Sequence, residues 1–181
     1  QAAGFDPKRN LLHCFVLANI AMRTGHNDRA IAVLEQRPRG NNYFPFHYLD
    51  FMLGVAKLRR LDPDADRPLQ RFVQRFQGQN FIKEACQKLA WHALLQNDRP
   101  GYRRYMAQCR TLGSEVVDSD KSAQKEAEEG AVPIPVLLRA RLLFDGAYYE
   151  KAYEVLAERT AAQFEAGRPR LEYYYRKGRL L

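Results

Sequence analysis

The sequence is short of cysteine and of the metal-binding patterns to which cysteine usually belongs. Its 181 residues contain three cysteines at wide spacing, Cys14, Cys86 and Cys109. No Cys-x-x-Cys pair and no cluster of cysteine with histidine occurs, so the sequence predicts neither a zinc site nor a disulfide framework. Cys14 and Cys86 each lie four residues before a small residue of a predicted helix. That position favours a buried, unreactive thiol over a nucleophile.

Long apolar runs and catalytic motifs are also missing. The longest apolar run, residues 14–22, is far shorter than the roughly 20 residues that a membrane-crossing helix needs. The sequence has no glycine-rich phosphate loop, no Gly-x-Ser-x-Gly and no His-Glu-x-x-His, and His13, His26, His47 and His92 are scattered. We therefore expect no membrane span, no metal, no cofactor and no enzymatic activity.

Positive charge and aromatic residues, by contrast, are plentiful. The net charge is +8, and the chain has ten tyrosines and ten phenylalanines with 46% hydrophobic residues overall. A basic balance permits nucleic acid, anionic lipid or an acidic protein as partner. The arginines are spread over many predicted helices, which favours an ordinary solvated surface.

Apolar residues recur at helical spacing along nearly the whole chain. Asn10 is a suitable N-cap for the first helix, and Gly25 is suited to the left-handed position that ends it. We expect helices over residues 10–24, 28–37, 44–60, 81–96 and 102–112, another that ends at Gly78, and a helical pair within 137–157. Pro38 and Gly40 interrupt the chain between the second and third helices.

Small residues recur at a fixed period in these helices. Ala18, Gly54 and Ala90 are separated by 36 residues each, whereas Ala140 follows Ala90 by 50 and Gly178 follows Ala140 by 38. A repeat of this length is typical of helical hairpins that stack side by side. The excess of 14 residues before Ala140 predicts an insertion.

The hairpins themselves are marked by a second small residue on the returning helix. Ala30 follows Ala18 by twelve residues, and Ala152 follows Ala140 by the same distance. Tyr149 comes just after the turn of the later hairpin, and we expect its ring to fill the groove between the two helices.

The insertion, residues 114–130, differs in composition from its flanks. It carries six acidic residues: Glu115, Asp118, Asp120, Glu126, Glu128 and Glu129. Two lysines are interleaved with them, so we expect a short, solvated polar helix that Gly130 closes, and not a catalytic carboxylate site.

The repeats predict an all-α fold formed by one domain over residues 1–181. We expect a right-handed superhelical stack of antiparallel helical hairpins, an α-solenoid with about four hairpins and the first helix of another. The expected units are residues 10–40, 43–78, 79–113, 132–160 and the incomplete 168–181. Because an unpaired amphipathic helix cannot bury its apolar face alone, we expect the array to continue beyond Gly178.

The pattern resembles the tetratricopeptide repeat (TPR) family. The small-residue pairs Ala18-x11-Ala30 and Ala140-x11-Ala152 match its motif, as do Leu53-Gly54, Leu89-Ala90, Tyr174-x3-Gly178 and Pro38. The sequence departs from the motif where Asp66 and Tyr102 replace the second small residue. The chain is also similar to bacterial TPR proteins of unassigned function, which are longer and often exported. This resemblance and a start at Gln1 imply that the sequence is a processed or excised piece of a longer protein. The resemblance suggests a periplasmic location, with a cytoplasmic one as the alternative.

The resemblance implies that a peptide binds on the concave face, which the first helices line. Its expected residues are Phe15, Asn19, Arg23, Phe51, Arg59, Gln87, Trp91 and Arg141. Phe51 and Trp91 have a second interpretation, in which they pack between repeats. Only Asn19 matches the clamp with which some TPR domains hold a terminal carboxylate, since Phe15 stands where a lysine is needed.

Two functions remain open at this point. The first is a protein–protein interaction scaffold with an unidentified peptide or protein partner. The alternative is an RNA-binding helical repeat, suggested by arginine and tyrosine interleaved in 99–105 and 171–179. Arg103, Arg104 and Arg110 fall on second helices, which form the convex face of a TPR-like stack, so nucleic acid is the less favoured partner.

Overall fold

A computed structural model describes residues 5–38 and 44–180 of the chain, and this part is all-helical, with no β-strand. The prediction of an all-α fold is confirmed. Gly40, the predicted break between the first two units, lies outside the described residues, as does Leu181. The α-helices and the two 3-10 helices are α1 (Leu11–Arg23), α2 (Asn27–Glu35), η1 (Phe44–His47), α3 (Tyr48–Arg59), α4 (Asp66–Arg75), α5 (Ile82–Leu95), α6 (Arg99–Thr111), α7 (Asp118–Glu129), α8 (Pro135–Asp145), α9 (Tyr149–Ala157), η2 (Ala161–Gln163) and α10 (Arg168–Gly178).

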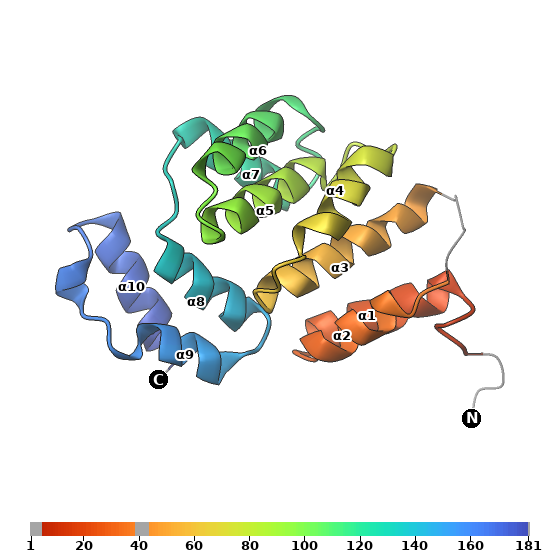
Figure 1. The fold of residues 1–181 in the computed structure, drawn as a ribbon, viewed down its shortest axis with the longest axis horizontal. Helices are drawn as coiled ribbons and strands as arrows, with labels where there is room; N and C mark the ends of the chain where they lie inside the picture. The colour runs from red at the N-terminus through yellow and green to blue at the C-terminus, as the bar shows by residue number, and fades with distance from the viewer. Residues whose placement is uncertain (1–4, 39–43, 181) are drawn as a thin grey trace.

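Helices that follow one another in the chain pack together. α1 pairs with α2, α3 with α4, α5 with α6 and α8 with α9, while α2 contacts α3 and α4 contacts α5. Figure 1 shows these helices following an arc from α1 and α2 through α3 and α4 to α5, α6 and α7, with α9 and α10 at the far end. Short tight turns join the helices of each pair, which explains their antiparallel course.

The small residues of the sequence lie where paired helices touch. Ala18, Ala90 and Ala140 are all buried. At Gly54, an added Cβ would lie 2.4 Å from Leu69 Cγ on α4, so α3 and α4 approach more closely than any larger residue allows. Gly25 has a φ of +77°, a backbone conformation in which glycine meets no steric penalty.

The helix α8 packs against both α3 and α5. Its contacts include both of these helices, and its residues Leu138 and Leu142 belong to the same apolar core as theirs. The turn after α8 reaches the turn between α1 and α2, where an added Cβ on Gly25 would lie 3.1 Å from Ala147 Cβ. Segments more than a hundred residues apart in sequence therefore meet.

The acidic insertion forms the predicted polar helix α7, which Gly130 closes with a left-handed φ of +68°, and most of its residues are exposed. One face of α7, however, is part of the core, which the expectation of a solvated segment did not include. Ala123 and Ala127 of α7 are fully buried against α5 and α6, and the carboxylate of Asp120 is fully buried as well. Asp120 accepts hydrogen bonds from the backbone N–H groups of Phe81, at 2.7 Å, and Glu84, at 3.1 Å. It thereby caps the N-terminus of α5 from another helix, where a negative charge is favourable.

The expectation for Tyr149 also needs correction. Tyr149 does not fill the groove of its hairpin: it is 54% exposed, and its ring contacts Phe144 alone among aromatic residues in the described part. In α10 the buried tyrosine is Tyr173, which stacks on Phe164, whereas Tyr174 is 58% exposed. Gly178 ends α10 in open space. Close helix contact at Gly178, which the motif implied, is not seen within the described residues.

Candidate functional site

One hollow of the surface gathers four of the eight residues that the sequence placed on the concave face. Asn19 and Arg23 reach it from α1, and Phe51 and Arg59 reach it from α3. Its volume is about 370 Å³. We call it the inner groove, and its full lining is Asn19, Met22, Arg23, Tyr48, Phe51, Met52, Val55, Arg59, Phe81, Glu84 and Asp145. These residues come from α1, α3, α5 and α8, and from Phe81, the residue just before α5.

The floor of the inner groove is aromatic. Tyr48, Phe51 and Phe81 form a triangle, with ring centroids 5.3, 4.9 and 5.4 Å apart. Phe81 has a left-handed φ of +65°, and its N–H is held by Asp120. The insertion helix α7 therefore fixes one wall of the groove, although none of its residues lines it.

The charges of the inner groove balance. Arg23 and Arg59 contribute two positive charges, and Glu84 and Asp145 contribute two negative ones. Burial lowers the pKa of Arg59, while Asp145 and Glu84 act in the opposite direction. Burial raises the pKa of Tyr48 to about 12, so its hydroxyl stays protonated and able to donate. Such a surface suits a polar but neutral peptide backbone with an apolar side chain.

Two more predicted residues lie buried beneath other helices. Gln87 and Trp91 are 5% and 2% exposed, and both donate to the carboxylate of Glu126 on α7, each at 2.7 Å. Lys88 and Arg141 lie over the indole ring, at 4.0 and 4.8 Å from its centre. Trp91 therefore packs between helices, as its second interpretation held, and a partner does not reach it in this structure. Phe51 also packs in the core, at 5% exposure and with its ring 5.3 Å from that of Phe72, although it lines the inner groove.

Phe15 and Arg141, the remaining two, stand apart from the inner groove. Phe15 is half-buried, with its ring 6.3 Å from that of Tyr48. Arg141 lines a different hollow between α7, α8 and α10. The structure thus brings Asn19 and Arg23 of α1 together with Phe51 and Arg59 of α3 in the inner groove. Phe15 and the predicted residues of α5 and α8 lie outside it.

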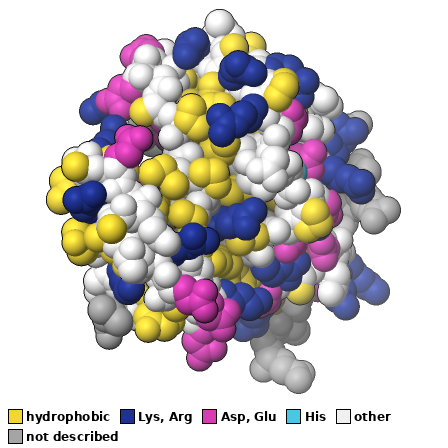
Figure 2. All heavy atoms as spheres, turned by 60° about the vertical axis from the view of Figure 1, so that its left-hand side comes forward, with side chains coloured by type: hydrophobic (Ala, Val, Ile, Leu, Met, Phe, Trp, Pro, Cys, Tyr) yellow, Lys and Arg dark blue, Asp and Glu magenta, His cyan; other side chains and the backbone are white. Residues whose placement is uncertain are grey.

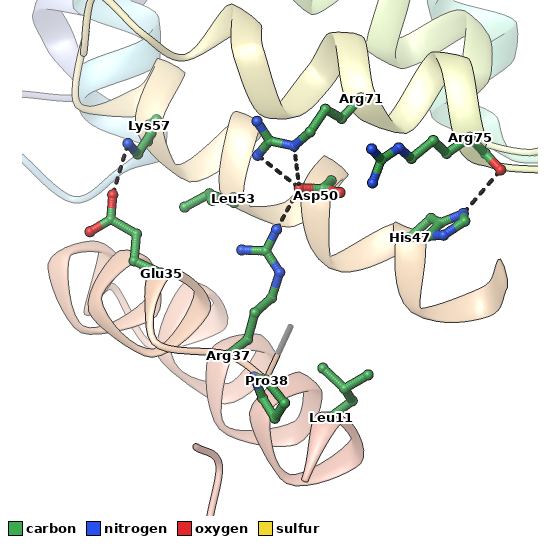
Figure 3. Close-up of a pocket in the computed structure, with 10 residues that line it drawn as sticks. All are labelled: Leu11, Glu35, Arg37, Pro38, His47, Asp50, Leu53, Lys57, Arg71 and Arg75. Atoms are coloured by element: carbon green, nitrogen blue, oxygen red, sulfur yellow. Dashed lines mark hydrogen bonds and ion pairs between the residues drawn. The ribbon is translucent and has the colours of Figure 1, made fainter. Parts of the chain in front are cut away.

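Sequence reasoning missed a second, strongly polar pocket between α2, η1, α3 and α4 (Figure 3). We call it the arginine pocket. Its volume is about 590 Å³, and its lining is Leu11, Glu35, Arg37, Pro38, His47, Asp50, Leu53, Lys57, Arg71 and Arg75. Its residues are separated by up to 64 positions in the chain, and no motif links them. The only sequence signal was Asp50, an acidic residue between the apolar residues Leu49 and Phe51.

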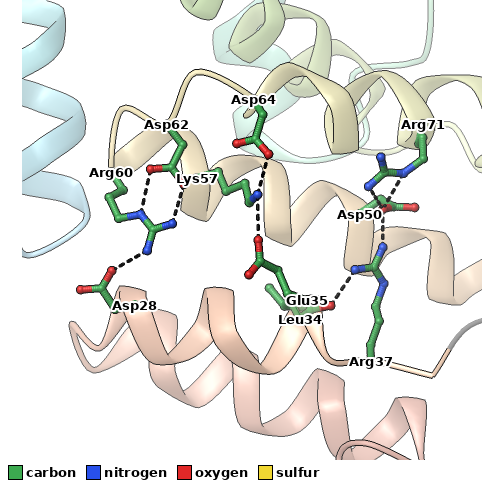
Figure 4. Close-up of polar contacts among 10 residues, drawn as sticks. All are labelled: Asp28, Leu34, Glu35, Arg37, Asp50, Lys57, Arg60, Asp62, Asp64 and Arg71. Carbon is green, nitrogen blue, oxygen red and sulfur yellow. Dashed lines mark hydrogen bonds and ion pairs between the residues drawn. The ribbon is translucent and has the colours of Figure 1, made fainter.

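Ion pairs extend from the arginine pocket along the contact between α2, α3 and α4 (Figure 4). Lys57 lies 2.8 Å from both Glu35 and Asp64. Further along, Arg60 contacts Asp62 at 2.6 Å and Asp28 at 2.9 Å. The pairing with Arg60 lowers the pKa of Asp28, and the pairing with Lys57 lowers the pKa of Asp64. These ion pairs connect neighbouring helices. Their charged groups are therefore occupied in holding the fold together.

On the face that Figure 2 brings forward, the α8–α10 side, lysine and arginine side chains lie among hydrophobic ones and do not form one continuous patch. Arg103 and Arg104 are exposed on α6, and Arg104 lies over the ring of Tyr105, 4.9 Å from its centre.

Neither a metal centre nor a reactive thiol is found in the described residues. No group of three histidine, cysteine or acidic side chains is placed to hold a metal ion. All three cysteines are buried, and burial raises the pKa of Cys86 to about 12 and that of Cys109 to about 11. Among the described helices, none is long and apolar enough to cross a lipid bilayer.

Comparisons with known proteins return no relative. No family model matches the chain, and neither the curated proteins nor the solved structures contain a match.

Proposed function

We propose that this protein is a non-enzymatic scaffold for protein–protein interactions, and that a peptide or a segment of a partner protein binds in the inner groove. The observation that carries the proposal is the composition of that groove. Two arginines, two acids and an amide surround an aromatic floor in one open hollow. Aromatic and arginine side chains dominate the binding energy of protein interfaces.

The proposal includes a TPR-like, right-handed stack as the underlying architecture. Its support is the 36-residue period of small residues and the pairing of consecutive helices. Because α8 packs against α3 and α5 and its Asp145 lines the groove, we infer that the groove is short. We expect it to receive one or two side chains of a peptide, not an extended chain along the whole array.

The balance of charge in the groove favours a peptide over RNA. Two of the four charged side chains that line the groove, Glu84 and Asp145, are acidic and would repel a phosphate backbone, whereas affinity for nucleic acid comes largely from a surplus of positive charge. A titration with single-stranded RNA at low salt, where phosphate binding is strongest, is expected to show no saturable binding. Saturable binding would favour the RNA alternative.

A peptide-display selection on the whole chain tests the proposal. Selected peptides are expected to lose about tenfold in affinity for Asn19→Ala and Arg23→Ala, because interface side chains of this kind contribute about 1–2 kcal/mol. Arg29→Ala is the matched control, since Arg29 is exposed on α2 and lies outside the groove. Equal losses in control and groove variants, or no enriched peptide, would contradict it.

A further inference from the structure

The arginine pocket carries an excess of positive charge. Arg37, Lys57, Arg71 and Arg75 line it against Glu35 and Asp50, so four positive charges face two negative ones. Lys57 is engaged by Glu35 and also by Asp64, which lies outside the pocket. The excess is therefore concentrated at the other end, around the three arginines.

A buried carboxylate fixes two of these arginines. Asp50 is 7% exposed, and its Oδ1 atom accepts from Arg37 Nη2 at 2.6 Å and from Arg71 at 3.0 and 3.2 Å. Arg37 also donates to the carbonyl oxygen of Leu34. One carboxylate neutralises only one of the two guanidinium groups, and each of these groups has five N–H donors. Charge and donors thus remain available at a fixed position.

The third arginine is not neutralised by the described residues. No described carboxylate lies within ion-pair distance of Arg75, whose side chain is exposed at the pocket rim. In Figure 3 its guanidinium group points towards Asp50 and Arg71. The neighbouring His47 ring bonds to the Arg75 carbonyl through Nδ1 at 3.0 Å. A carbonyl only accepts, so this nitrogen carries the proton.

We propose that the arginine pocket binds a phosphoryl group in its doubly charged form. Its two excess positive charges match a dianion, and planar guanidinium groups bind phosphate oxygens with paired hydrogen bonds. The volume of about 590 Å³ leaves room for an organic group attached to the phosphate. This site lies between α2, α3 and α4 and is separate from the inner groove.

Titration of the whole chain with inorganic phosphate at low salt tests this assignment. The Nε–H signals of the arginines are followed by NMR, and those of Arg37, Arg71 and Arg75 are expected to shift and saturate together. Arg75→Gln is expected to weaken binding about tenfold through loss of a charge-assisted hydrogen bond. Arg67→Gln, on the same helix but outside the pocket, is expected to leave the affinity unchanged.

Binding of other small anions shows which kind of phosphate the pocket takes, and three results would refute the proposal. Phosphoserine that binds at least as tightly as inorganic phosphate assigns the site to an esterified phosphate, and binding of inorganic phosphate alone assigns it to the free ion. Shifts spread evenly over all arginines, equal losses in Arg67→Gln and Arg75→Gln, or acetate binding as tightly as phosphate would each refute a built dianion site.

Discussion

The close approach of α3 and α4 can be tested by adding one methyl group at Gly54. In Gly54→Ala the new Cβ would lie 2.4 Å from Leu69 Cγ and 2.7 Å from Leu69 Cδ2. The overlap is expected to lower the free energy of unfolding by about 1–3 kcal/mol, measured by urea denaturation. Gly178→Ala is the control, because Gly178 has open space around it, and we expect a change within about 1 kcal/mol. Equal effects at both positions would contradict the packing described.

The cysteines make a second prediction at the scale of single residues. Cys14, Cys86 and Cys109 are buried, and burial raises the pKa of each thiol. Because the thiolate is the reactive form, the native protein is expected to react only slowly with Ellman's reagent at mildly alkaline pH. The same protein in guanidinium chloride, as control, should release three equivalents at once. A fast-reacting thiol in the native state would show that one of these sites is open.

Among the elements, α7 contributes one face to the core, which its acidic composition did not predict. Six acidic residues in and before the helix indicated a solvated segment, yet its register places alanines and Asp120 on one inward face. Local composition cannot reveal that face, because Asp120 caps the N-terminus of α5, and Phe81 at that N-terminus lies 39 residues earlier in the chain. Helix bounds were more accessible: the expected 10–24 and 81–96 correspond to Leu11–Arg23 and Ile82–Leu95.

Removal of the Asp120 carboxylate tests the role of α7. Asp120→Ala leaves the N–H groups of Phe81 and Glu84 without these acceptors, and we expect a loss of about 1–3 kcal/mol in the free energy of unfolding. Asp118→Ala, on the same helix with a side chain 98% exposed, should change it by less than about 0.5 kcal/mol. Fluorescence of Trp91, the only tryptophan, follows both unfolding transitions.

At the scale of the whole molecule, the contact between the first and last helical pairs was beyond sequence reasoning. Tyr148 Oη donates to Asp28 at 2.9 Å and accepts from Asn27 at 3.0 Å, which also donates to the carbonyl of Ala56. These residues lie about 120 positions apart, and periodicity describes only neighbours in the chain. The packing of α8 against α3 and α5 depends on such long-range contacts, and so does the burial of Trp91 and Gln87 beside Glu126 of α7.

Tyr148→Phe tests this closure. The variant loses both hydrogen bonds of the hydroxyl, and we expect a decrease of about 1 kcal/mol in the free energy of unfolding. Faster amide hydrogen exchange in α8 and α9 should accompany it. Tyr149→Phe is the adjacent control, because Tyr149 is exposed and the described residues give its hydroxyl no partner. Similar behaviour of the two variants would mean that the hydroxyl of Tyr148 does not hold the ends together.

Photo-crosslinking with a display-selected peptide that carries a benzophenone tests peptide binding in the inner groove most directly. Mass spectrometry of the adducts identifies which residues of this chain the bound peptide touches. We predict adducts at Asn19, Met22 or Arg23, the α1 residues of the inner groove. An excess of unlabelled peptide should abolish them. Adducts confined to the exposed faces of α6, α9 or α10 would contradict the proposed site.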